Sequence, residues 1–176
     1  SFIPQLDQVP RDMVRGEGAV VFPIRLGERD VDLFLGSVIS FEGSFSRHIR
    51  AEAQAGSQLL VVATNESSYG PDAPASDQFI ELARVNAAAV GQDLILAAIT
   101  GKSTFITAEG NVGEVTETLE RTVIYDEMQF RAAGPTLYTR IGDWMILVAL
   151  AGAAAGMFTP GPGRPEGGIR GRRMGM

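Results

Sequence analysis

A strand-like run that leads through a serine into a helix-like run constrains this chain more than any other feature. The apolar residues 31–39 predict a β-strand, Ser40-Phe41-Glu42 follow as a turn, and residues 46–55 predict a helix. A sharp turn between a strand and a helix exposes one side chain at the edge of a sheet, beside backbone N–H groups that can hold an oxyanion. The segment therefore predicts Ser40 at the position of a nucleophile in an α/β fold.

The rest of the chain continues this alternation of strands and helices. Further strands are predicted at residues 19–26, 58–64, 94–99, 104–107 and 122–130, with a hairpin turn at 27–30 and a helix at 79–90. The run at 58–64 is apolar without a break, which is typical of a strand buried on both faces. Strands that alternate with helices in this way indicate a layered α/β architecture.

The composition limits the chemistry that the chain can support. Its 176 residues, 45% hydrophobic and 20% charged, are enough for one globular domain with its own core. There is no cysteine, and the single histidine, His48, cannot form a histidine metal site alone, so we expect no metal and no cofactor. Because the chain begins with Ser1 and shows no signal-like leader, we expect a processed or incomplete N-terminus.

Residues 144–158 form an uncharged apolar segment ahead of a basic tail. Fifteen helical residues rise about 22 Å, less than the ~30 Å of a bilayer core, so length alone favours a C-terminal core helix. Trp144 at one end and the small-residue pair Gly152 and Gly156 favour a membrane helix instead, as do the arginines that follow. We predict three regions: a body at residues 1–143, a transmembrane helix at 144–158 and a disordered basic tail at 159–176.

Charge is distributed unevenly along the chain. The net charge is −6, but residues 160–176 carry four arginines against one glutamate, a net of +3, which leaves −9 for the remaining residues. An acidic body argues against nucleic acid as a partner. The positive-inside rule then predicts a cytoplasmic tail, and with it a body on the extracytoplasmic side of the cell membrane.

Spacing argues against two familiar catalytic patterns. Gly101-Lys102-Ser103 lacks the glycine that a phosphate loop requires five residues upstream, since that position is Leu96, and we expect Lys102, the only lysine, in a solvated turn. A hydrolase triad would require His48 to fold back over the turn, and no Gly-x-Ser-x-Gly pattern surrounds the serine. We therefore expect His48 on a solvated helix face.

A set of motifs in a fixed order resembles the carbon–nitrogen hydrolase (nitrilase) superfamily and, within it, the apolipoprotein N-acyltransferase family, particularly its actinobacterial members. The resemblance covers most of residues 19–158. The matching motifs are Val38-Ile-Ser-Phe-Glu42, residues 56–65 (GSQLLVVATN), Gly70, residues 78–84 (QFIELAR), Thr100-Gly-Lys-Ser103, Glu109-Gly110, and residues 136–144 (TLYTRIGDW).

The resemblance implies an α-β-β-α sandwich, here its C-terminal portion, anchored by transmembrane helices on the outer side of the cytoplasmic membrane. Members of the family move an acyl chain from a phospholipid to a cysteine thiol and then to the N-terminal amine of a lipoprotein, using a glutamate base and a lysine. The implied partners are a phospholipid acyl donor, a lipoprotein acceptor and the membrane. Ser40 matches the cysteine, Glu42 matches a supporting glutamate, and Phe41, Ser68 and Tyr69 are the implied substrate contacts.

The chain departs from the family pattern at important positions. The family's base and lysine lie upstream of the matched region, and the usual Arg-Ala-x-Glu pattern reads Asn86-Ala-Ala-Ala89. A serine alcohol is a much weaker nucleophile than a thiolate, so we expect this chain alone to be inactive. The alternatives are a non-catalytic lipid- or lipoprotein-binding scaffold of the same fold and a soluble amidase-like hydrolase that uses Ser40.

Overall fold

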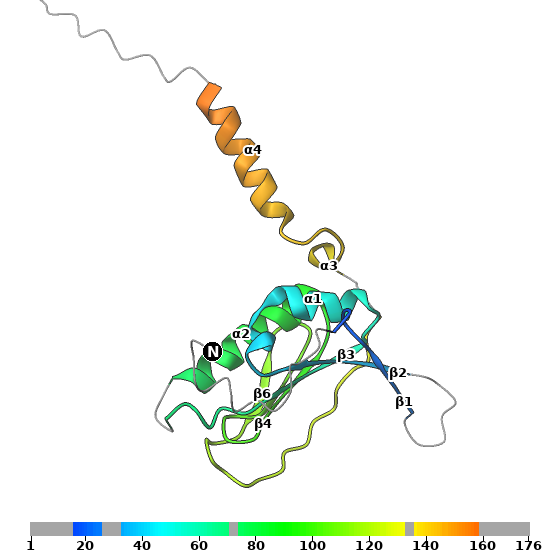
Figure 1. Ribbon diagram of the computed structural model, residues 1–176, viewed down its shortest axis with the longest axis vertical. Coiled ribbons are helices and arrows are strands. Elements are labelled where there is room, and N and C mark those ends of the chain that lie inside the picture. The colour runs from blue at the N-terminus through cyan, green and yellow to red at the C-terminus, as the bar shows by residue number, and fades with distance from the viewer. Residues whose placement is uncertain (1–15, 26–32, 71–73, 133–135, 159–176) are drawn as a thin grey trace, which may run out of the picture. The chain divides into compact units, whose positions relative to one another are not determined.

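Six β-strands form one mixed sheet in a computed structural model that describes residues 16–25, 33–70, 74–132 and 136–158 (Figure 1). The chain divides into two units between Gly142 and Asp143, and the sheet belongs to the first unit. In chain order the strands are β1 (Phe22–Ile24), β2 (Leu33–Ile39), β3 (Leu59–Thr64), β4 (Leu94–Ala98), β5 (Thr104–Ile106) and β6 (Val112–Val115). They lie side by side in that same order; β2, β3 and β4 are parallel, and the other neighbours are antiparallel.

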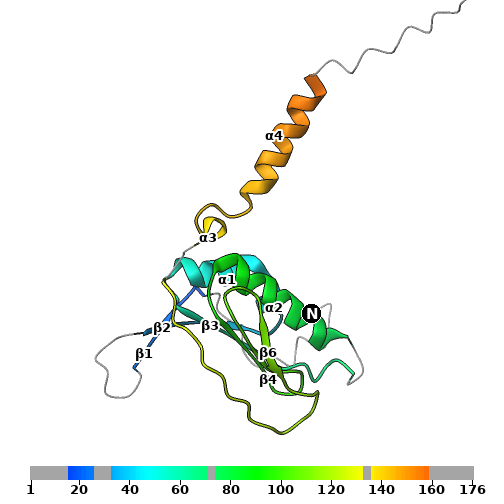
Figure 2. The ribbon, with the colours of Figure 1, turned by 180° about the vertical axis from the view of Figure 1, so that it is seen from behind.

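Helices connect the parallel strands and cover one face of the sheet: the 3₁₀ turn η2 (Ser40–Ser44), α1 (Ser46–Gln54) and α2 (Ala75–Val90). The short helix α3 (Leu137–Ile141) follows the last strand in the chain and packs against α1 and α2. Parallel neighbours require a crossover, and α1 and α2 supply the crossovers from β2 to β3 and from β3 to β4. Both views show α1 and α2 together over the same face of the sheet (Figure 1 and Figure 2). The predicted layered α/β architecture is confirmed.

The core lies between the sheet and these two helices. Its buried side chains come from alternate positions of the strands and from one stripe of each helix: Val38, Ile49, Leu60, Val62, Ala83, Ala87, Val90, Leu94 and Leu96 are among them. The opposite face of the sheet is far more open, with Ile39 66% exposed and Ala63 also exposed. The prediction that residues 58–64 are buried on both faces holds at Leu59, which is 5% exposed, and fails toward the carboxyl end of β3, where Ala63 is exposed.

The end of helix α2 follows its local sequence, whereas its start and its buried face differ from those that the sequence predicts. It begins at Ala75, four residues before the predicted start, and ends as predicted at Gly91, whose φ of 68° lies in the left-handed region that favours glycine. The apolar pattern of residues 79–90 predicts Leu82 in the stripe that is buried, but Leu82 is exposed and Ile80 is buried. The apolar face that meets the sheet is therefore rotated slightly from the one that the sequence pattern indicates.

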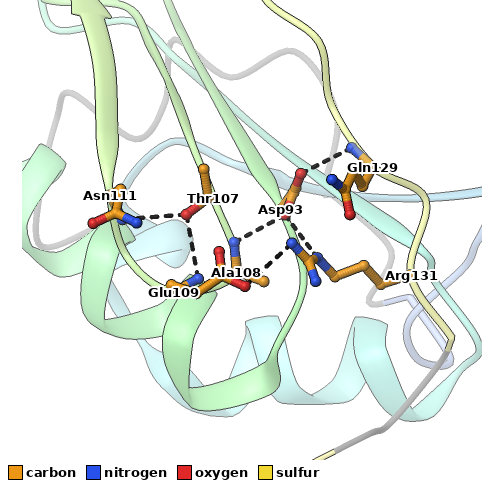
Figure 3. Close-up of polar contacts among 7 residues, drawn as sticks. All are labelled: Asp93, Thr107, Ala108, Glu109, Asn111, Gln129 and Arg131. Atoms are coloured by element: carbon orange, nitrogen blue, oxygen red, sulfur yellow. Dashed lines mark hydrogen bonds and ion pairs between the residues drawn. The ribbon is translucent and has the colours of Figure 1, made fainter.

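The predicted strand at residues 122–130 does not form; this segment has no regular secondary structure, and β6 forms at Val112–Val115 instead. A buried carboxylate fastens the segment (Figure 3). Asp93 accepts hydrogen bonds from the backbone N–H groups of Gln129 and Ala108, at 2.8 and 2.9 Å, and pairs with the guanidinium of Arg131 at 3.0 Å. Arg131 also pairs with Glu109 at 3.2 Å. These side-chain bonds replace a strand ladder, which is why the β-like sequence did not add a strand.

The second unit contains α4 (Trp144–Phe158), a helix with the predicted bounds. It has 15 residues, and none of them is buried. Within the described residues, no helix combines the length and the apolar character that crossing a membrane requires. The prediction of a transmembrane helix is therefore not confirmed, although the helix itself is. The predicted hairpin turn at 27–30 and the tail at 159–176 lie outside the described residues.

Candidate functional site

Ser40 occupies a strained turn at the carboxyl end of β2. Its φ is +55°, in the left-handed region that residues with a Cβ seldom adopt, at a cost of about 1–2 kcal/mol. The chain turns through η2 directly afterwards, and Gly43 there is buried so closely that an added Cβ would collide with Val62. Such strain persists only where surrounding packing holds it, and it is common at functional sites. The structure thus places Ser40 on the expected strand-to-helix turn.

An open hollow of about 460 Å³ lies beside Ser40. Small and apolar residues at the carboxyl ends of β2, β3 and β4 line it together with three polar ones: Ile39, Ser40, Ala63, Thr64, Asn65, Ala97, Ala98 and Ile99. The carboxyl ends of parallel strands are the usual position of ligand sites in α/β proteins. The walls suit an apolar ligand, and Ser40 is the hydroxyl at the turn.

Glu42 and His48 lie apart from this hollow. Both line a different cavity of about 660 Å³, between residues 16–22, β2 and α1. The Nε2 atom of His48 accepts a hydrogen bond from Arg47 at 3.3 Å, and its ring packs against Phe45. Within the described residues, no hydrogen bond joins the side chain of Ser40 to His48 or Glu42. The structure therefore does not assemble a serine triad, in agreement with the spacing argument.

Lys102 is also committed elsewhere. Its ammonium group donates a hydrogen bond to Asp77 at 2.6 Å, and this bond raises the pKa of Lys102 above its ordinary value. It lines a surface groove with residues of α2 and β6, and it is absent from the lining of the Ser40 hollow. Lys102 is not the activating partner of Ser40 in this structure.

The three predicted substrate contacts have different environments. Phe79 of α2, which is buried, lies edge-on to Phe41 with ring centroids 6.3 Å apart and near Tyr69 at 6.4 Å. Phe41 and Tyr69 are thus brought together by a third ring, while their own side chains stay exposed. Ser68 is exposed and lines none of the cavities described above. As the first apolar residue of the predicted helix at 79–90, Phe79 is predicted as a core residue, and the sequence gives no sign of its place between two site residues.

Asn86 is the functional candidate that sequence reasoning missed most clearly. It is 1% exposed; its Nδ2 donates to the carbonyl of Gly43 at 3.0 Å, and its Oδ1 accepts from the hydroxyl of Ser46 at 2.6 Å. One amide thus ties α2 to both the turn after Ser40 and the start of α1. Serine often caps the start of a helix, but Ser46 is the first residue inside α1, and α1 has no side-chain N-cap bond. An amide within the apolar stripe between Ala83 and Ala87 was the available signal.

Two buried carboxylates also escaped prediction. Glu52 of α1 is 7% exposed, and burial raises its pKa above the ordinary 4.5, opposed by a hydrogen bond from the backbone of Ser37. Glu66, directly after β3, is 4% exposed and accepts a hydrogen bond from Ser76. Each has one oxygen without a hydrogen-bond partner. In the described part of the chain, no three acidic or histidine side chains gather as a metal site would require.

Comparisons with known proteins give a consistent family. No protein-family model matches the chain. It is 31% identical over 135 residues to the apolipoprotein N-acyltransferase of Gloeobacter violaceus, covering 77% of this chain and 25% of that protein. It is 32% identical over 120 residues to the apolipoprotein N-acyltransferase of Geobacter metallireducens, covering 68% of this chain and 23% of that protein. The chain thus spans about a quarter of the length of these relatives.

Solved structures show the same fold class. An amidase from Nesterenkonia sp. superposes with a TM-score of 0.54 at 16% identity, covering 75% of this chain and 49% of that chain. A mutant of a Nesterenkonia amidase from the nitrilase superfamily gives a TM-score of 0.51 at 15% identity, covering 78% and 50%. These likenesses establish a nitrilase-type α/β fold, and the sequence relatives identify the branch. The chain therefore belongs to the apolipoprotein N-acyltransferase family.

Proposed function

We propose that this chain is the part of an acyl-transfer protein that carries the nucleophile position, and that Ser40 occupies that position. The observation that carries the proposal is the left-handed turn at Ser40, at the carboxyl end of β2 and beside an apolar hollow. The names of the sequence relatives supply the reaction class, acyl transfer to lipoproteins. Because those relatives are about four times as long as the matched region, the remaining machinery is proposed to lie outside these residues.

The proposed reaction has two steps. The nucleophile at position 40 attacks an ester carbonyl of a phospholipid and its proton passes to a base; the ester C–O bond then breaks, and the lysophospholipid leaves with that proton as an acyl-enzyme forms. The neutral N-terminal amine of a lipoprotein then attacks the acyl carbon and gives one proton to the base; the bond between the acyl carbon and the nucleophile breaks, an amide forms, and the nucleophile takes up that proton. Backbone N–H groups of the turn would hold the developing oxyanion. Phe41 and Tyr69 would contact the acyl chain at the mouth of the hollow, Ser68 would border it, and Glu42 would support the turn.

The same residues explain why we propose that the reaction is impaired. A serine hydroxyl needs a base within hydrogen-bond reach, and the side chain of Ser40 has no bond to Glu42 or His48 in the described structure. Lys102, the only lysine, is engaged by Asp77. We therefore expect the chain by itself to transfer acyl groups far more slowly than a protein with a cysteine at this position.

A membrane location is also part of the proposal. The helix α4 presents apolar side chains such as Leu147, Leu150 and Phe158, and none of its residues is buried. Exposed apolar surface of this extent is typical of a segment that meets lipid or a protein partner. We propose that α4 contacts the lipid of the cell membrane, with the body at residues 1–143 on the extracytoplasmic side and the basic tail at 159–176 in the cytoplasm.

The competing function is a scaffold of the same fold that binds lipid or lipoprotein without chemistry. The alcohol at Ser40 and the engaged Lys102 favour it. Transfer of a labelled acyl chain from phospholipid to a lipoprotein-like peptide separates the two functions, measured on protein from the membranes of the cells that produce it. Transfer that rises by orders of magnitude in the Ser40→Cys variant supports the acyltransferase proposal. No transfer by either form, with the acyl chain and the peptide still bound, supports the scaffold.

A further inference from the structure

Glu66 lines a small pocket of about 190 Å³ that borders the Ser40 hollow. Asn65 lines the hollow, Glu66 follows it in the chain and lines the pocket, and Thr100 reaches Asn65 with a hydrogen bond of 3.4 Å. Among the described residues, the pocket walls carry hydroxyl groups from Ser67, Tyr69, Ser76, Thr100 and Thr118, and no lysine or arginine. A carboxylate surrounded by hydroxyl groups, with no cation among these described lining residues, is the chemistry of a site for a positive ligand.

Only one of the two carboxyl oxygens of Glu66 has a hydrogen-bond partner in the described structure. One carboxylate oxygen accepts a hydrogen bond from Ser76 in the first turn of α2, where the helix dipole also favours a negative charge. The other oxygen, Oε1, is buried and has no hydrogen-bond partner. Gly101 lies against this carboxylate so closely that an added Cβ would collide with it. The carboxylate is therefore held in place, and a buried charged oxygen without a partner is costly.

We infer that this pocket binds a primary ammonium group. An ammonium carries three N–H donors, enough for Oε1 of Glu66 and for hydroxyl oxygens such as those of Thr100 and Thr118. The ring of Tyr69 is a further wall that a cation can contact. A divalent metal fits less well, because it prefers several carboxylate oxygens, and the described residues contain no cluster of three acidic or histidine side chains.

The pocket is a candidate binding site for the amine that accepts the acyl group in the proposed reaction. If the proposed function holds, the ammonium is the N-terminal amine of the acceptor chain, held beside the hollow in which the acyl group sits, and it gives up one proton to the base of the proposed reaction before its nitrogen attacks the acyl carbon. That identification rests on the proposed function, whereas the binding of an amine in the pocket does not. Binding and acyl transfer can therefore fail separately in experiments.

The test is a titration of the 176-residue chain with methylammonium, followed by backbone amide NMR shifts. We expect saturable shifts that are largest at Ser76, Tyr69 and Gly101. Glu66→Gln should weaken the binding by about tenfold to a hundredfold, because it removes a charge-assisted hydrogen bond. Glu114→Gln removes an exposed carboxylate outside the pocket and should leave the binding of methylammonium unchanged.

Two comparisons on the unsubstituted protein keep the inference testable even if Glu66→Gln folds poorly. Tetramethylammonium has the same charge but no N–H donors. Potassium also has the same charge but forms no directional hydrogen bonds. Both should bind much more weakly than methylammonium. Equal shifts with all three cations, no saturable shifts with methylammonium, or unchanged binding in a folded Glu66→Gln protein would overturn the inference. Methylammonium binding without acyl transfer would instead count against the proposed function alone.

Discussion

At the scale of single residues, Ser40 combines a strained backbone with an unactivated side chain. Its φ of +55° suits glycine better than any residue with a Cβ. We expect Ser40→Gly to leave the free energy of unfolding unchanged or to raise it by up to about 1 kcal/mol, as measured by urea denaturation. Ser37→Gly, in the middle of β2, is the matched control and should lower it by about 0.5–1 kcal/mol. If Ser40→Gly lowers the free energy of unfolding as much as Ser37→Gly does, the backbone at Ser40 is not strained.

Asn86 offers a second test at this scale. Asn86→Ala removes the bonds to Gly43 and Ser46 and leaves a buried carbonyl and hydroxyl without partners, which should cost about 2–4 kcal/mol of unfolding free energy. Asn86→Asp keeps the acceptor for Ser46 and loses the donor to Gly43. We expect the amide of Gly43 to show faster hydrogen exchange in both variants. If hydrogen exchange around Gly43 is unchanged in Asn86→Ala, the side-chain amide of Asn86 does not hold the turn.

The residues that sequence reasoning missed share one physical property. Ser40 was identifiable because its signal is local: a strand, a turn and a helix that follow one another. Asn86 and Phe79 acquire their roles from contacts with residues about forty positions away, which no local pattern reveals. Glu66 resembles any loop carboxylate until Gly101 and Ser76 close around it.

At the scale of elements, the buried carboxylate on α1 predicts a pH effect. Burial raises the pKa of Glu52 in the folded protein, so the folded state binds this proton more tightly than the unfolded state. The stability that the protonated carboxyl contributes is complete below the unfolded value of 4.5 and is lost as pH rises through the folded value. Glu52→Gln should therefore raise the Tm at neutral pH, and this gain should shrink as the pH is lowered toward 4.5.

Glu17, Glu42 and His48 line the same cavity as Glu52, so Glu42→Gln serves as the control for Glu52→Gln. Glu42 is exposed, and its substitution should change the Tm at neutral pH less than Glu52→Gln does. Thermal denaturation over a series of pH values is the measurement. If Glu52→Gln changes the Tm by the same amount at every pH, the raised pKa of Glu52 is not the cause of the change.

The elements that were predicted well are those whose ends carry local signals. Helix α1, the end of α2 at Gly91 and the bounds of α4 follow from apolar periodicity and glycine. The segment at 122–130 was wrongly predicted as a strand because its composition is β-like. In the structure, Asp93 binds the backbone of Gln129, and the carbonyl of Gln58 binds that of Arg131 directly after the segment. Whether a β-like segment enters a sheet depends on an available edge, which the local sequence does not encode.

At the scale of the whole molecule, the apolar helix α4 carries the prediction of membrane contact. We expect the chain to bind lipid vesicles and to sediment with them. Leu150→Arg, near the middle of α4, should weaken the free energy of vesicle binding by about 2.5–3.5 kcal/mol if the helix lies in the hydrocarbon. Leu119→Arg, an exposed apolar residue of the first unit, is the control and should bind vesicles as before. Equal losses for the two variants, or no sedimentation of the unsubstituted chain, would argue against lipid contact by α4.

The central claim is that position 40 is where the acyl group is carried. Its most direct test is the intact mass of the protein, isolated from the membranes of producing cells and incubated with phospholipid. The account predicts that Ser40→Cys gains one acyl chain, that the unsubstituted protein gains it orders of magnitude more slowly, and that Ser44→Cys, in the same turn, gains none. An unmodified Ser40→Cys protein, or equal acylation of Ser44→Cys, would contradict the claim.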